Sequence, residues 1–250
     1  MAGHSKWANI KHRKGAQDAK RSKIFTRIIK ELTIATKEGG EDIDGNPRLR
    51  TAIQNAKGAN MPKDTIQRAI KKGGENNSIN YTEVSFEGYG SNGIAFFIEC
   101  TTDNNNRTVA NIRSIFNKYG GALGTNGSLE FMFERKGVFV ISKESFSLDI
   151  DDFEMDLIDS GLEELQKENN SVFIYTDFSN FNSMQKKLED LNIKIESAKL
   201  ERIPSATKKL SLDAAKSVLK MIDAFDDDDD VQNIFHNLEM TDELISIITV

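Results

Sequence analysis

Charge is divided very unevenly along this chain of 250 residues. The first 30 residues hold nine Lys or Arg and a single acid, so they carry +8 in a chain whose net charge is −6. Residues 1–72 carry +10, with seventeen basic and seven acidic side chains, which leaves −16 on residues 73–250. Such separation indicates a basic module that faces a polyanion and an acidic body that is kept away from it.

The basic leader also contains side chains that suit nucleic-acid bases. Trp7, the one Trp of the chain, lies among the cations together with His4 and His12. Aromatic rings and imidazoles can stack on bases or ribose while cations hold phosphates. A solvated tail is the alternative, since most charge runs are only that. We predict nucleic-acid contact from Lys6, Trp7, Lys11, His12, Arg13, Lys14, Lys20, Arg21, Lys23, Arg27 and Lys30.

Composition is typical of a globular protein in a reducing compartment. The chain is 38% apolar and 29% charged, which is enough for a packed core. Its single cysteine, Cys100, excludes an internal disulfide and a zinc site built from cysteines. The longest strongly apolar runs, residues 94–98 and 138–141, are too short to span a bilayer, and the pattern of a signal peptide is missing. We therefore expect a cytoplasmic protein without membrane contact.

The first 75 residues are predicted to form a basic arm and a bundle of three helices. Residues 1–21 lack a sustained periodicity and are interpreted as an extended arm. Apolar residues recur at helical spacing from Ser22 to the pair Gly39-Gly40, which is typical of a helix end. On this helix Arg27 and Lys30 lie off the apolar stripe and are expected to point to solvent.

Two further helices follow in this part of the chain. Asn46-Pro47 is a strong start signal, because a capping side chain precedes the residue best suited to the first helical position. Pro62 opens the third helix, and Gly73-Gly74 closes it. The short break between the two invites a helix-turn-helix interpretation, but small bundles turn corners in the same way, and the charge is densest before the first helix. The third helix supplies secondary candidates for nucleic-acid contact, namely Lys63, Gln67, Arg68 and Lys71.

From Tyr81 onward the residues favour β-structure. Residues 81–88 and 94–102 are predicted to form a hairpin, followed by a helix that is capped within Thr102-Asp103-Asn104 and by a strand at residues 129–133. Residues 137–203 then show strand, helix and strand twice over, which is the ferredoxin-like plan.

A helix that begins near Ser211 and a strand within residues 231–240 are expected to complete the sheet that begins at Tyr81. We therefore predict an α+β fold, in which a three-helix bundle with its basic arm is followed by two α/β sandwich-type domains, one of them ferredoxin-like and inserted in the other. The predicted domains are residues 1–75, residues 80–136 plus 205–250, and residues 137–204.

Apparent cofactor and metal motifs have simpler explanations. Gly88-x-Gly90-x-x-Gly93 matches a dinucleotide fingerprint, but strands flank it on both sides where the fingerprint needs a helix after it, so we expect a glycine hairpin. Asp226 to Asp230 lacks the glycine and the terminal Glu of a calcium loop. We interpret this run as a solvated loop, with competition for the basic arm as an alternative. Residues 136–140 faintly resemble an RNA-recognition strand, but residues 137–203 carry −8, which favours a partner surface or a scaffold. We expect no metal and no cofactor.

Catalytic residues are equally scarce. The three histidines are split between the two ends of the chain, and Cys100 has no base beside it in the sequence. Glu87 and Glu99 could be neighbours on the hairpin, with a surface pair as the simpler interpretation. We therefore predict a protein that is not an enzyme and has no small-molecule substrate.

Three stretches carry a resemblance to known proteins: MAGHSKWANIKHRKGAQDAKRSKIFTRIIKEL, NPRLRTAIQNAKGANMPKDTIQRAIKKG and YTEVSFEGYG. Through them the chain resembles, over nearly its whole length, the YebC family of transcriptional regulators and mitochondrial translational activators. The resemblance implies a cytosolic, non-enzymatic protein of three domains that acts on gene expression through nucleic acid. Some members are described as DNA-binding regulators and others as ribosome-associated factors that relieve stalling on proline-rich sequences.

We predict a nucleic-acid-binding regulator whose basic arm and bundle hold phosphates. Its candidate partners are ribosomal RNA or the ribosome, and promoter DNA. Cations position phosphates but do not read bases, so high specificity would have to come from shape or from a further partner. The alternative is a protein-interaction module whose basic arm binds an acidic protein.

Overall fold

The structure of the protein is a computed structural model that describes residues 18–75, 79–143, 150–168 and 170–249. The chain divides into two compact units. One contains Ile79–Glu134 and Arg202–Val250, and the other contains Gly15–Ser78 and Arg135–Glu201. Because the chain returns to the first of these units at Arg202, residues 135–201 are an insertion between its two segments.

One asparagine joins two helices of the N-terminal bundle. Its Nδ2 donates to the carbonyl oxygens of Ala35 (2.7 Å) and Gly40 (2.8 Å), and its Oδ1 accepts from the backbone N–H of Leu49 (3.0 Å). This residue is Asn46, so the predicted start signal is confirmed, and a single side chain satisfies backbone groups at two helix ends. The helices of the bundle are α2 (Asp18–Gly39), α3 (Pro47–Gly58) and α4 (Lys63–Gly74).

Helix α2 begins four residues before the predicted start at Ser22. Lys20 and Arg21 are therefore helical, and the prediction that an extended arm reaches residue 21 is wrong. Ala, Lys and Arg all favour helix, so the helix continues toward its N-terminus without apolar periodicity. That periodicity detects only the part of a helix that packs on a core. The core of the bundle consists of Leu32, Ala35, Leu49, Ala52, Ile53, Ala56, Met61, Ile66 and Ala69.

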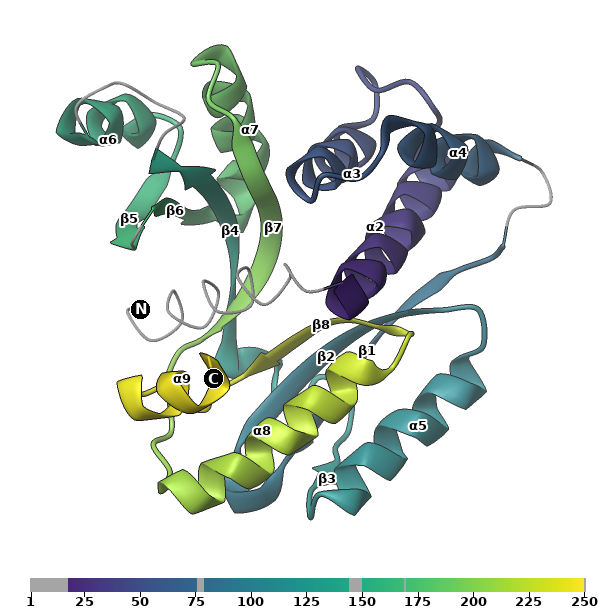
Figure 1. Ribbon diagram of the computed structural model, residues 1–250, viewed down its shortest axis with the longest axis vertical. Helices are drawn as coiled ribbons and strands as arrows, with labels where there is room; N and C mark the ends of the chain where they lie inside the picture. Colours follow the sequence, from purple (N-terminus) through teal and green to yellow (C-terminus); the bar gives the residue numbers. More distant parts are fainter. Residues whose placement is uncertain (1–17, 76–78, 144–149, 169, 250) are drawn as a thin grey trace. The chain divides into compact units, whose positions relative to one another are not determined.

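The first sheet has the strand order β3-β1-β2-β8, and each neighbouring pair is antiparallel. Helices α5 and α8 cover one face of this sheet (Figure 1). The rings of Phe96, Phe116 and Phe225 meet in the core on that face, with centroids 5.0 to 6.2 Å apart. The elements are β1 (Thr82–Tyr89), β2 (Ala95–Thr102), α5 (Asn105–Lys118), β3 (Ala122–Leu123), α8 (Leu212–Asp227), β8 (Val231–His236) and α9 (Asp242–Thr249), the last of which we did not predict.

The prediction of a glycine hairpin is confirmed. Strands β1 and β2 pair from Thr82 opposite Thr102 to Tyr89 opposite Ala95. A single 3-10 turn at Ser91–Gly93 connects them, and Gly93 has a φ of 69°, which glycine adopts without strain.

The predicted strand at residues 129–133 is wrong. Glu130–Met132 form a 3-10 turn instead, and the strand on the other side of β1 from β2 is the shorter Ala122–Leu123. The buried carboxylate of Glu87 accepts hydrogen bonds from the backbone N–H groups of Gly127 and Leu129, so a side chain supplies acceptors that a strand would have supplied. Leu129 and Phe133 are buried in a small cluster with Phe97 and Phe235, which explains their strand-like pattern.

The second sheet has the strand order β5-β6-β4-β7. Taken with the order of its elements along the chain, this is the ferredoxin-like arrangement, and strand β8 completes the first sheet after the insertion, so the predicted α+β fold is confirmed. The proposed domain boundaries remain a prediction. The elements are β4 (Phe133–Ser142), α6 (Ile150–Ile158), β5 (Leu162–Glu168), β6 (Ser171–Asp177), α7 (Phe181–Asp190) and β7 (Ile195–Pro204).

Helix α3 contacts strand β7, which is an edge strand of the second sheet. Asn55 Nδ2 donates to the carbonyl oxygen of Ala198 at 2.8 Å, and Asn55 Oδ1 accepts from the N–H of Ala198 at 2.7 Å. The asparagine amide thus takes the place of a neighbouring strand. A Cβ on Gly58 would lie 1.8 Å from the carbonyl oxygen of Glu196, so the close approach of helix and strand requires glycine at that position.

Candidate nucleic-acid interface

Many of the predicted contact residues lie outside the described part of the chain. These are Lys6, Trp7, Lys11, His12, Arg13 and Lys14. The backbone of Lys20 belongs to helix α2, and its side chain is not among those described. The described candidates are therefore on α2, from Arg21 onward, and on α4.

Arg21 lies exposed near the start of α2. Its guanidinium carbon is 5.4 Å from the centroid of the Phe25 ring, and its Nη2 donates to the carbonyl oxygen of Asn60 at 3.4 Å. Stacking on Phe25 holds the planar cation near the surface while leaving part of its donor fork exposed. Arg21 therefore remains a candidate for contact with a phosphate.

The other cations of α2 are less accessible than the stripe pattern predicts. Lys23 and Arg27 are half-buried, and Lys30 exposes only 7% of its surface, so the expectation that Lys30 points to solvent is wrong. Leu32 to Thr36 are also buried without interruption, which shows that this half of α2 is surrounded on several sides. A helix on the surface buries one apolar stripe and exposes its other sides, whereas this half of α2 buries more of its circumference.

Helix α4 presents a row of exposed polar side chains. Lys63, Gln67 and Lys71 are all exposed and lie one turn apart, while Ile66 and Ala69 face the core. Within the described residues, neither lysine has a carboxylate at ion-pair distance. Two ammonium groups and an amide between them offer donors along a line of about 11 Å, at 5.4 Å per turn.

Arg68, the fourth candidate on this helix, is exposed but partly engaged. Its Nε donates to the carbonyl oxygen of Asp64 at 3.2 Å, and its Nη2 donates to Thr65 Oγ1 at 3.3 Å. Both partners belong to the preceding turn. The guanidinium therefore lies along the helix surface and is a weaker candidate than the row of Lys63, Gln67 and Lys71.

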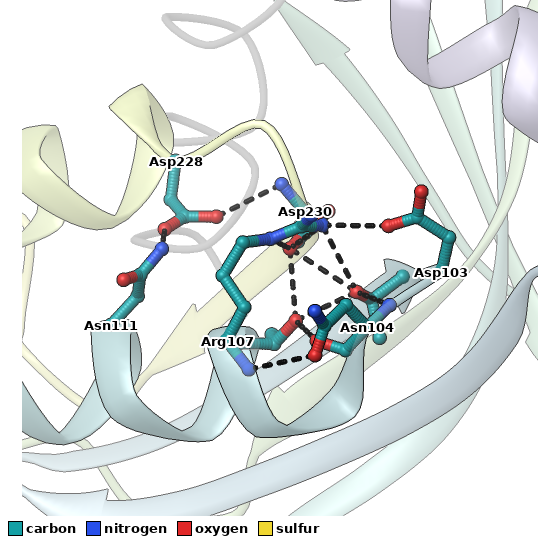
Figure 2. Close-up of polar contacts among 8 residues, drawn as sticks. Asp103, Asn104, Arg107, Asn111, Asp228 and Asp230 are labelled. Carbon is teal, nitrogen blue, oxygen red and sulfur yellow. Dashed lines mark hydrogen bonds and ion pairs between the residues drawn. The ribbon is translucent and has the colours of Figure 1, made fainter.

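The aspartate run contains a buried anchor, so the interpretation of a fully solvated loop is wrong for Asp230. Figure 2 shows the Asp230 carboxylate bonded to Arg107 of α5. Its Oδ2 accepts from Nη2 at 2.7 Å and from Nε at 3.2 Å. It also accepts from the hydroxyls of Thr102 (3.2 Å) and Thr108 (2.8 Å). The carbonyl oxygen of Asp230 accepts from the N–H of Thr101, which adds a residue to the ladder between β2 and β8.

Neighbouring side chains extend this network. Asp228 accepts from Asn111 Nδ2 at 2.9 Å, and Asp103 accepts from Arg107 Nη2 at 2.9 Å (Figure 2). The hydrogen bond from Arg107 to Asp230 raises the pKa of the guanidinium, so Arg107 stays charged. Burial raises the pKa of Tyr81, and the carboxylates of Asp103 and Asp230 act in the same direction. In the sequence, the spacing of Asp103 and Arg107 indicates a helical ion pair, but no local signal indicates Asp230.

Arg107 is consequently not available to bind phosphate, because two carboxylates already neutralise it. The described residues contain no group of three or more His, Cys, Asp or Glu side chains arranged to hold a metal ion. The network holds α5 against the loop before β8 and has a structural role.

Glu87 and Glu99 each have a different partner. Glu87 stands opposite Phe97 in the hairpin, and its buried carboxylate accepts from the N–H groups of Gly127 and Leu129. The interpretation of Glu87 and Glu99 as a surface pair is therefore wrong. Glu99 accepts from Arg202 Nε at 3.0 Å, and the Arg202 guanidinium lies 3.8 Å from the centroid of the Phe97 ring. The two carboxylates do not share a site.

No helix in the described ranges has the length and the hydropathy needed to cross a membrane.

Comparison with known proteins gives matches over nearly the whole chain. Residues 5–76 match the family model of the TACO1/YebC protein N-terminal domain, and residues 81–238 match that of the TACO1/YebC second and third domain. Relatives named "Probable transcriptional regulatory protein" include one from Amoebophilus asiaticus, which is 49% identical over 243 residues (95% of this chain and 98% of the relative). Another, from Geobacillus thermodenitrificans, is 47% identical over 240 residues (96% and 97%).

A solved structure shares the fold. The crystal structure of a conserved hypothetical protein from Aquifex aeolicus matches with a TM-score of 0.81 and 38% sequence identity, over 91% of this chain and 93% of that chain. The arrangement of a helical bundle with two sheets is therefore common to both proteins.

Proposed function

The chain belongs to the TACO1/YebC family, and from this premise we propose that it is a non-enzymatic, cytoplasmic regulator of gene expression that binds nucleic acid through its basic N-terminal module. Its relatives are named as transcriptional regulatory proteins. The observation that carries the proposal is the exposed row of Lys63, Gln67 and Lys71 within a stretch of 72 residues whose net charge is +10. Lysines of a helix that have no carboxylate partner among the residues that the structure describes are suited to phosphate oxygens.

The chemistry of the row favours contact with the backbone of the nucleic acid. Ammonium groups neutralise phosphates but do not distinguish bases, and Gln67 is the one side chain of the row that can form paired hydrogen bonds to a base edge. Specificity would then depend on the shape of the nucleic acid. Structured RNA, as in a ribosome, and promoter DNA are the two forms of target that the proposal covers.

The test is to measure affinity for a duplex DNA and for a stem-loop RNA at a series of salt concentrations, together with co-sedimentation with ribosomes. If the basic arm neutralises about six phosphates, log K should fall against log salt with a slope of roughly −4 to −5. Replacing Lys11, Arg13, Lys14, Lys20 and Arg21 together by Gln should abolish binding and leave the melting temperature nearly unchanged.

Several outcomes would count against the proposal. Failure to bind either nucleic acid or the ribosome at low ionic strength would contradict it, as would an affinity that does not depend on salt. Stronger binding to an acidic polypeptide such as polyglutamate than to both nucleic acids would favour an interaction module for acidic proteins. A loss of stability in the fivefold variant would assign those residues a structural role.

A further inference from the structure

Helix α6 of the ferredoxin-like sheet has two apolar faces. Phe153 and Leu157 are one turn apart and fully buried in the core. On the outer side, Met155 and Ile158 expose 67% and 58% of their surface. Single exposed apolar residues are normal on a protein surface. Two large ones at positions i and i+3 of a nine-residue helix are neighbours and form a continuous apolar surface.

Acidic side chains surround this apolar pair. Five exposed carboxylates belong to the helix or directly follow it, namely Asp151, Asp152, Glu154, Asp156 and Asp159. The ammonium of Lys187 comes within 3.9 Å of Asp156. We call Met155, Ile158 and these five carboxylates the α6 surface.

The stability of the helix does not account for all of this charge. Asp151 and Asp152 occupy the first turn, where carboxylates stabilise the helix dipole. Asp156 and Asp159 lie at the other end, where the dipole disfavours negative charge, and the last turn has no basic residue. The stability of the helix therefore does not explain these two acids, and the contact with Lys187 involves Asp156 alone.

We propose that the α6 surface is a docking site for a basic protein segment that contributes at least one apolar side chain. The apolar pair would be covered by that side chain, and the carboxylates would pair with Lys or Arg around it, as in the apolar centre and polar rim of protein interfaces. A nucleic acid does not fit, because phosphates are repelled by carboxylates. The proposal does not depend on the nucleic-acid function, since it concerns the insertion and a different partner.

Binding of three labelled peptides of equal length to the full chain tests this proposal. The first combines Lys and Leu at helical spacing, the second combines Lys and Ser, and the third combines Glu and Leu. The Lys/Leu peptide should bind at least about tenfold more tightly than either of the others, and its affinity should weaken with salt. Equal binding of the Lys/Ser peptide would overturn the proposal, because the apolar pair would then contribute nothing.

The variant M155S/I158S should weaken binding of the Lys/Leu peptide by about tenfold, and D152N/E154Q/D156N should remove most of its salt dependence. The fold should persist in both, because all five side chains are exposed. A matched control is L212S/D213N on α8, which removes an exposed apolar residue and a neighbouring carboxylate from another helix and should leave the affinity unchanged.

Full affinity in M155S/I158S would overturn the proposal. Displacement of the probe by a peptide of residues 1–17, together with dimerisation of the chain, would identify a second copy as the source of the basic segment and would support the proposal.

Discussion

The Asp230 carboxylate is bonded by the Arg107 guanidinium across 123 positions of sequence, with Oδ2 2.7 Å and Oδ1 2.9 Å from Nη2 (Figure 2). The aspartate side chain is 6% exposed and the arginine side chain 47% exposed. The pair therefore joins a buried acceptor to a partly solvated donor. The buried Thr102 hydroxyl also donates to this carboxylate and would lose that acceptor on its removal, whereas the Thr108 hydroxyl would keep the carbonyl oxygen of Asn104 at 3.0 Å.

Asp230→Ala should destabilise the fold more than any other single replacement in the aspartate run. We expect the free energy of unfolding to fall by about 2 kcal/mol, which is less than for a fully buried ion pair because Arg107 is half-exposed. The measurement is denaturant unfolding. Asp229→Ala, at an exposed position of the same run, is the control and should cost less than about 0.5 kcal/mol. Similar losses in both variants would refute the assignment of Asp230 as the anchor.

Asn55→Ala should weaken the contact between α3 and β7. The change removes the hydrogen bonds that Asn55 makes to the N–H and to the carbonyl oxygen of Ala198. We therefore expect the free energy of unfolding to fall by about 1 to 3 kcal/mol. Gly58→Ala should also destabilise, since its Cβ would overlap the backbone of Glu196. Lys57→Ala, at an exposed position of the same helix, is the control. Wild-type unfolding midpoints for both variants would mean that this contact does not persist in solution.

Lys63→Gln combined with Lys71→Gln should weaken binding to nucleic acid without changing the melting temperature. Each lysine that neutralises one phosphate of duplex DNA contributes about 0.9 to the slope of log K against log salt, so the slope should become shallower by about 2. The matched control is K216Q/K220Q, which removes two exposed lysines of α8. If both double variants alter the slope equally, the row on α4 is not the interface.

Asp177 is expected to titrate at an unusually low pH. The Ser179 hydroxyl, which donates to Asp177 Oδ1 at 2.6 Å, lowers the pKa of this carboxyl, and the Ser179 backbone N–H at 2.8 Å acts in the same direction. Since the pKa in the unfolded chain is about 3.9, the resulting stabilisation is complete above that pH and is lost as the pH falls through the lower pKa of the folded state.

Ser179→Ala should therefore raise the pKa of Asp177, as followed by NMR of the side-chain carboxyl carbon. It should also shift the loss of stability to higher pH. Ser183→Ala, at an exposed position on the next helix, should leave the titration unchanged. An unaltered Asp177 titration in Ser179→Ala would show that the hydroxyl is not the cause.

Much of the fold could be predicted because its signals act over a few residues. The predicted helix starts are confirmed by the capping side chains of Asn46, Asn104 and Ser211. The predicted helix ends are marked by the positive φ of Gly40 and Gly120. The strand predicted at residues 129–133 failed because buried residues at both ends of a turn imitate strand alternation. Of the candidate interface, the row on α4 could be placed from helical spacing, whereas the burial of Lys30 could not.

The sequence alone thus established the local elements, the charge separation and the family. Each of these depends on patterns among neighbouring residues or on a count of charges along a segment. Tertiary structure decided which charged groups are buried and with what partner. Glu87, Lys30 and Asp230 look like exposed charges in the sequence but are buried, and the hydrogen-bond partners of Glu87 and Asp230 lie far away along the chain. A charge is stable in a protein interior only where hydrogen bonds or an opposite charge replace its water, and packing alone determines whether such partners are within reach.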